Sequence, residues 1–137
     1  MKNLFIVTAI IEFGTGFVLI ALPWILTLLL FGSMPDTPVA DAVARVAGVA
    51  ILALAVACWF ARNDGQSPAT RGLVMAMLIY NTAVSIVLVY SAFGLSLSGI
   101  ILWPVVLLHL SMSFWCIMSL LNKRSNQNVL QPKPNSN

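Results

Sequence analysis

The chain of 137 residues is too apolar for a water-soluble globule, because 60% of its residues are hydrophobic, 8% are charged and the mean hydropathy is +0.96. A soluble domain carries about 25% charged residues, so this composition predicts an integral membrane protein. The formal net charge of +3 is small, and no basic patch with interleaved aromatic residues points to nucleic-acid binding.

Four apolar segments are long enough to cross a bilayer, which takes about 20 helical residues. They cover residues 4–31, 41–61, 72–93 and 100–121. Short connections join antiparallel neighbours, so the predicted fold is all-α, an integral membrane up-down four-helix bundle over residues 1–122. The polar, proline-bearing tail over residues 123–137 is expected to be a disordered cytoplasmic segment.

The first segment follows Lys2 and resembles a signal peptide in its apolar character. Its apolar run is longer than a signal sequence requires and contains Glu12, so a membrane helix is the better interpretation. Pro23 is expected to kink this helix without ending it. Trp59 and Trp103 lie near predicted helix ends, where aromatic side chains meet the membrane interface, whereas Trp24 is harder to place.

The second segment contains Arg45, a charge that is costly inside lipid. Asp41 precedes Arg45 by one helical turn, so we expect the two to pair at a membrane boundary.

Small residues recur at every fourth position of this segment. They form two ridges: Ala40, Ala44 and Gly48, and Ala53, Ala57 and Ala61. Small side chains allow close helix contacts in lipid, so the ridges predict neighbours on more than one side. The alternative is that alanine is present only because it favours helix.

Basic residues are concentrated in three places, while the other two loops have none. The basic residues outside the second helix are Lys2, Arg62, Arg71, Lys123, Arg124 and Lys133. The positive-inside rule then places both termini in the cytoplasm of a multi-pass protein in the bacterial inner (plasma) membrane.

The two cysteines, Cys58 and Cys116, have neither CxxC spacing nor a nearby set of histidines. We expect buried free thiols that pack as small apolar groups. The sequence predicts no metal site and no cofactor.

Each predicted helix carries at least one polar group: Glu12, Arg45, Tyr80 with Asn81, and His109. Counting about 1.5 Å per residue places Glu12, Asn81 and His109 at one level near the midplane, with Arg45 closer to the outer edge. Such residues can form a proton relay or an acid–base pair lining a cavity. They can equally be hydrogen bonds that fix helix register. No P-loop, GxSxG or HExxH motif is present, so no catalytic residue is assigned.

A set of short motifs resembles a group of small four-helix bacterial membrane proteins that is similar to the wider DoxX-like set. The motifs are Glu12 with Gly16 and Pro23, Arg45-Val-Ala-Gly48, Ala57-Cys58-Trp59, Arg71-Gly72, Tyr80-Asn81, Leu102-Trp103-Pro104 and His109. They cover about residues 10–110. The resemblance implies a four-helix bundle in the inner membrane. Some DoxX-like proteins are named as membrane subunits of quinone-linked oxidoreductases, but no redox motif here carries that role over.

Three functions are compatible with the sequence. The first is a non-catalytic accessory or assembly component that binds a second copy or a membrane-complex partner. The second is a small carrier or binder of a lipophilic molecule or proton that uses the midplane polar residues. The third is an intramembrane isomerase that acts on a sterol-like or isoprenoid substrate. The missing catalytic motifs favour the first.

Overall fold

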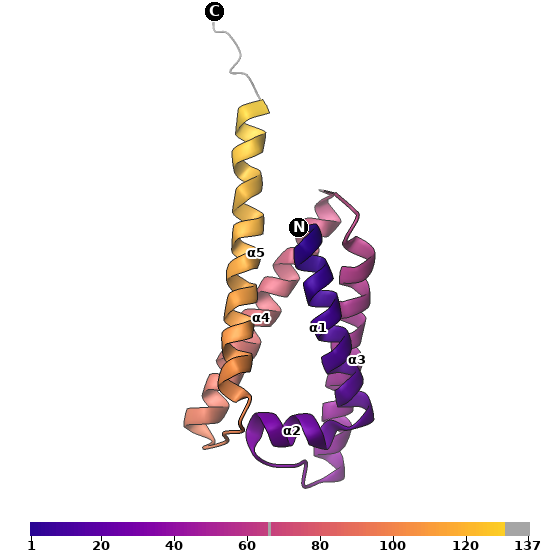
Figure 1. Ribbon diagram of the computed structural model, residues 1–137, viewed down its shortest axis with the longest axis vertical. Helices are drawn as coiled ribbons and strands as arrows, with labels where there is room; N and C mark the ends of the chain where they lie inside the picture. The colour runs from indigo at the N-terminus through magenta and orange to yellow at the C-terminus, as the bar shows by residue number, and fades with distance from the viewer. Residues whose placement is uncertain (66, 131–137) are drawn as a thin grey trace, which may run out of the picture.

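The computed structural model describes residues 1–65 and 67–130, which form five α-helices and no strand (Figure 1). The helices are α1 (Lys2–Ala21), α2 (Pro23–Phe31), α3 (Pro38–Ala61), α4 (Pro68–Gly94) and α5 (Leu102–Leu130). Four stretches are long and apolar enough to span a membrane, namely α1, α3, α4 and the part of α5 over Leu102–Leu121. The all-α, multi-pass prediction is therefore confirmed.

The prediction of one continuous helix over residues 4–31 is wrong, because the chain breaks at Leu22. Proline has no N–H and disfavours the helical conformation of the residue before it. Leu22 accordingly has φ −139° and ψ 61°, and α2 starts at Pro23. The nine residues of α2 are too few to cross a bilayer. This helix instead lies across the end of the molecule, as Figure 1 shows.

Backbone hydrogen bonds hold α2 against the connection between α4 and α5. Gly99 N–H donates to the Leu30 carbonyl over 3.0 Å, and Ile101 N–H donates to the Leu29 carbonyl over 3.1 Å. These bonds satisfy carbonyls that the end of a helix leaves without partners. Only glycine fits at position 99, because a Cβ there would lie 2.1 Å from the Leu29 carbonyl oxygen.

The starts of α3 and α4 follow one local pattern, a hydroxyl N-cap followed by proline. Thr37 Oγ1 accepts from the Ala40 N–H, and Ser67 Oγ accepts from the Thr70 N–H, both over 3.1 Å. Both helices therefore begin three or four residues before the predicted positions 41 and 72.

The last helix also extends further than predicted. It continues to Leu130 and so includes residues 123–130, part of the tail that the sequence predicts to be disordered. The remaining part of that tail, residues 131–137, lies outside the described residues.

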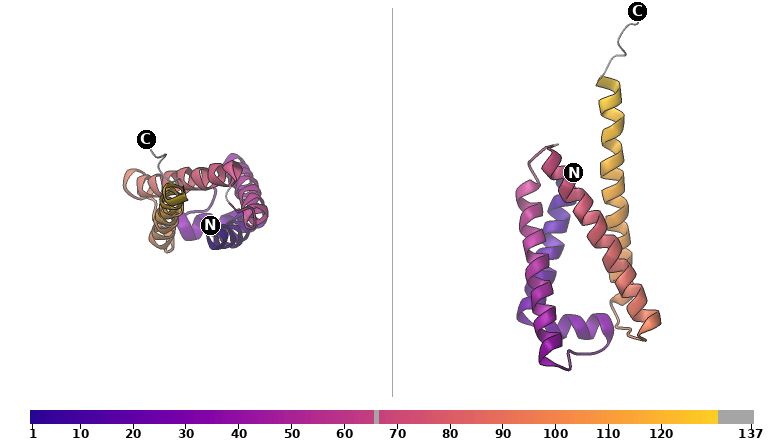
Figure 2. Two further views of the ribbon diagram at one scale, coloured as in Figure 1. Left: turned by 90° about the horizontal axis from the view of Figure 1, so that it is seen from above. Right: turned by 180° about the vertical axis from the view of Figure 1, so that it is seen from behind.

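The long helices form two antiparallel pairs, α1 with α3 and α4 with α5 (Figures 1 and 2). Helix α4 starts close to α1 and α3 and runs obliquely away from them toward its connection with α5. The two pairs are therefore closest near the N-terminus and are further apart at the end where α2 lies. Two groups of buried residues hold the helices together: the first is shared by α1, α3, α4 and α5, and the second joins α2 to α4 and α5. The N-terminal core consists of Leu4, Phe5, Ala9, Cys58, Val74, Met77, Met112 and Cys116. The α2-side core consists of Leu88, Leu102 and Val106, with Leu30 and Phe31 packed against it.

Both cysteines are free and buried in the N-terminal core, as predicted. The Cys58 sulfur lies 3.6 Å from the Met77 sulfur.

The contact between α1 and α3 depends on two glycines. A Cβ at Gly16 would lie 2.8 Å from the Gly48 carbonyl oxygen, and a Cβ at Gly48 would lie 2.9 Å from the Gly16 carbonyl oxygen. The first ridge of small residues is therefore used, at Gly48, within the protein itself. Close backbone approach of this kind stabilises helix pairs in lipid.

We predict that Gly16→Ala destabilises the protein by about 1–3 kcal/mol, because the added methyl group meets rigid backbone atoms and forces α1 away from α3. The free energy of unfolding, measured by SDS titration in mild detergent, checks this prediction. Gly14→Ala is the matched control, since a Cβ at Gly14 has no neighbour within 4 Å. Equal effects of the two substitutions would contradict the close contact.

Candidate functional site: a cavity between the helix pairs

A cavity of about 380 Å³ lies between the two helix pairs. Residues from all five helices line it, including Leu19, Leu26, Ala50, Val84 and Leu108. Helix α2 contributes Leu26 and also Leu30, which packs against the α2-side core. Hydrocarbon side chains make up most of the wall, and the polar ones come from Glu12, Thr15, Tyr80 and His109.

Glu12 of α1 is 4% exposed and lines the cavity beside Tyr80 of α4. The Tyr80 hydroxyl donates to Glu12 Oε2 over 3.3 Å. Within the described part of the chain, Oε1 of the same carboxyl group has no protein partner. Glu12 therefore links α1 to α4 and keeps hydrogen-bonding capacity for a molecule in the cavity.

His109 of α5 is held by Asn81 of α4. Asn81, which is 2% exposed, donates through Nδ2 to the Met77 carbonyl over 2.7 Å. Its Oδ1 must then act as the acceptor for His109 Nδ1, which lies 2.8 Å away. The proton of the neutral ring is thereby fixed on Nδ1, and Nε2 becomes an acceptor. No protein group within residues 1–65 and 67–130 hydrogen-bonds to Nε2.

Tyr80 and Asn81 are adjacent in sequence, but their side chains contact different helices. Successive residues of an α-helix point about 100° apart, so Tyr80 reaches α1 while Asn81 reaches α5. The Tyr80 and His109 rings meet edge to face, with centroids 5.8 Å apart and planes at 78°. The two hydrogen-bonded pairs thus form one polar cluster of Glu12, Tyr80, Asn81 and His109.

Arg45 does not belong to this cluster, which corrects the grouping made from sequence. Its Nε donates to Asp41 Oδ2 over 2.8 Å, and its Nη1 donates to the Ile20 carbonyl. Ile20 is among the last residues of α1, whose carbonyls have no partner within the helix. The predicted pair of Asp41 and Arg45 is confirmed, and it stabilises the end of α1.

Two features of the site were not found from sequence. Thr15 lines the cavity one turn from Ile11 and Glu12, and Leu26 and Leu30 close it because α2 turns across the bundle. The available signal was Pro23, since a proline inside an apolar run marks a probable helix end.

No group of three or more His, Cys, Asp or Glu residues within the described ranges is arranged to bind a metal ion. Comparison of the chain with protein-family models, curated proteins and solved structures finds no match.

We predict that Asn81 and His109 contribute an interaction free energy of about 0.6–1.7 kcal/mol to the stability of the fold, because their hydrogen bond connects two helices within the membrane. A double-mutant cycle of Asn81→Leu and His109→Leu, measured by unfolding in detergent, gives this value. Ser111→Ala combined with Asn81→Leu is the control, since the Ser111 hydroxyl bonds within its own helix to the Leu107 carbonyl. Additive effects in the Asn81–His109 cycle would contradict the cluster.

Proposed function

We propose that the protein binds a small lipophilic molecule in the cavity between its helix pairs. The observation that carries this proposal is the convergence of Glu12, Tyr80 and His109 on one cavity of about 380 Å³. Binding sites for small molecules are commonly 300–1,000 Å³, mostly apolar, with a few polar groups that orient the ligand. The cavity has all three properties.

The arrangement of polar groups indicates what the ligand carries. The Glu12 carboxyl group and His109 Nε2 both offer acceptor positions, so they suit a ligand with a hydroxyl or amine donor. The leucine and valine side chains of the wall suit a hydrocarbon body. A lipophilic alcohol or amine therefore fits the site better than a plain hydrocarbon does.

The same cluster also supports the carrying of a proton between Glu12 and His109. The single cavity and its apolar walls favour the binding of a lipophilic molecule over this alternative.

We predict that decanol binds the purified protein more tightly than decane, because its hydroxyl group can donate to Glu12 or His109. Glu12→Leu and His109→Leu should each weaken decanol binding by roughly fivefold, the effect of losing one hydrogen bond. Decane binding should not change. Equilibrium dialysis with radiolabelled decanol and decane in detergent gives the affinities.

Thr82→Val is the control for this experiment, since Thr82 pairs with Ser113 over 3.3 Å and does not line the cavity. Melting temperatures of all variants show that the fold is retained. Equal affinities of wild type, Glu12→Leu and His109→Leu for decanol would refute the proposal.

A non-catalytic accessory component is the second candidate. The ridge of small residues at Ala53 and Ala57 is exposed on α3 and is available to another helix. Crosslinking and mass measurement of the same preparations test this candidate. A strictly monomeric protein without a co-purified partner would count against it.

We further propose that the protein resides in the bacterial inner membrane with both termini in the cytoplasm. Lys2 and the connection with Arg62 and Arg71 lie at one end of the helices, and α5 projects beyond that same end (Figure 1). The opposite end carries the α1–α3 connection, where Arg45 is paired with Asp41. The positive-inside rule supports this orientation.

This orientation predicts that a membrane-impermeant maleimide labels Ser33→Cys in intact cells and labels Asn63→Cys only after permeabilisation. Both positions are exposed, and the native cysteines are buried, so the background should be low. Labelling of Asn63→Cys in intact cells would reverse the proposed orientation.

A further inference from the structure

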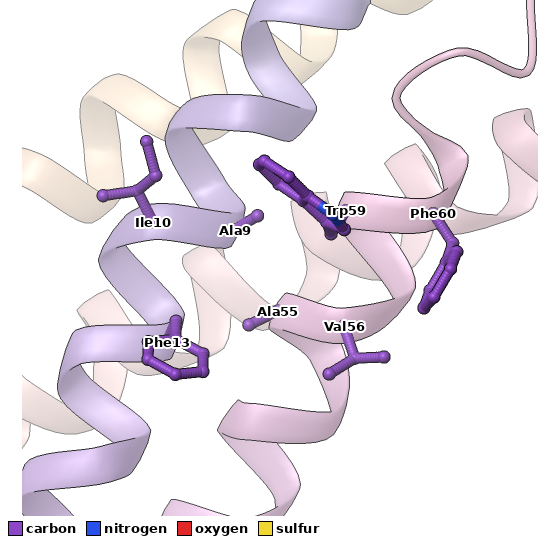
Figure 3. A pocket seen from close by; sticks show the side chains of 7 residues that line it. All are labelled: Ala9, Ile10, Phe13, Ala55, Val56, Trp59 and Phe60. Carbon is purple, nitrogen blue, oxygen red and sulfur yellow. The ribbon is translucent and has the colours of Figure 1, made fainter.

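An open apolar groove of about 360 Å³ lies between α1 and α3 (Figure 3), and none of the residues that line it belongs to the polar cluster. Ala9 and Ala55, both small, lie between the helices, and Phe13, Val56 and Trp59 flank them. The side chains that line the groove are hydrocarbon except for the indole nitrogen of Trp59. Its shape and chemistry suit an acyl chain.

A second open pocket of about 360 Å³ lies at the end of the same two helices. Lys2, Arg62 and Asn63 line it together with Asp64. Asp64 is directed to the start of α4, where its Oδ2 accepts from the Ser67 and Thr70 hydroxyls. These hydrogen bonds lower the pKa of Asp64, so it stays ionised near neutral pH. The two cations outnumber this one carboxylate, and the pocket therefore favours an anion.

Arg62 connects the pocket to the groove. Its guanidinium carbon lies 3.9 Å from the centre of the Trp59 ring, and its Nη1 donates to the Trp59 carbonyl. Trp59 is itself a wall of the groove. A guanidinium group has five N–H donors, so Arg62 keeps donors for a phosphate. A positive charge is thus fixed at the mouth of an apolar channel.

We propose that this surface binds one anionic phospholipid, with an acyl chain in the groove and the phosphate at Lys2 and Arg62. Charge complementarity selects this occupant over a second copy of the chain. A copy inserted in the same orientation would bring its own Lys2 and Arg62 to the same level and would be repelled. The site is separate from the cavity, which lies on other faces of α1 and α3, so it does not depend on the proposed function.

Native mass spectrometry of the full chain, released from detergent with dioleoyl phosphatidylglycerol or dioleoyl phosphatidylcholine, tests this site. We expect tighter binding of phosphatidylglycerol, with a loss of about fivefold for each of Lys2→Gln and Arg62→Gln. Binding of phosphatidylcholine should change little. Arg71→Gln is the matched control, because Arg71 lies in the first turn of α4, just after the same connection, but lines neither pocket.

The groove is tested separately with Val56→Trp, which fills it from an exposed position and should weaken both lipids. Val49→Trp, two turns away on α3 and also exposed, is its control. Equal affinity of the wild type for the two lipids, or an equal loss in Arg71→Gln, would overturn the proposal. A dimer that replaces bound lipid and disappears in Val56→Trp would overturn it in favour of a second copy.

Discussion

The break between Leu22 and Pro23 determines how the other helices are placed. Proline removes a backbone donor inside an apolar segment, and lipid offers no water to replace it. Because α1 ends at Ala21, the Ile20 carbonyl has no partner within the helix, and Arg45, which Asp41 holds in place, donates to it. The chain beyond the break turns across the bundle as α2. The helix break before Pro23 thus accounts both for the position of Arg45 and for α2, a helix that does not span the membrane.

The cavity is a consequence of that turn. Helix α2 binds the α4–α5 connection through backbone hydrogen bonds from Gly99 and Ile101. Helix α2 therefore separates the two helix pairs at one end of the molecule. At the opposite end, where the N-terminus lies, the N-terminal core joins the two pairs. The space between the two cores is the cavity that Glu12 and His109 both line. A straight first helix would leave this space without Leu26 and Leu30 as a wall.

The two proposed sites differ in the physics that forms them. Within the cavity, hydrogen bonds among buried groups position Glu12 and His109 in surroundings where unpaired polar atoms are costly. On the outer surface, no cluster of this kind exists among the groove residues, and the arginine at Trp59 supplies a charge at the end of an apolar channel. The first arrangement selects a ligand by hydrogen bonding, and the second selects a lipid by charge.

The sequence determined the class of fold, the four spanning segments, the Asp41–Arg45 pair and the buried thiols, because length, apolarity and helical spacing are local properties. It also identified Glu12, Asn81 and His109 as polar groups at similar depth, with Tyr80 next to Asn81 in the chain. Only the tertiary structure decided that Arg45 bonds to the end of α1 and that α2 closes a cavity beside the polar cluster. The physical reason is that spacing along a helix gives the depth of a residue, whereas the direction of the chain after Pro23 and the rotation of each helix depend on contacts distant in sequence. The Gly16–Gly48 contact and the bonds from Gly99 to α2 are contacts of that kind.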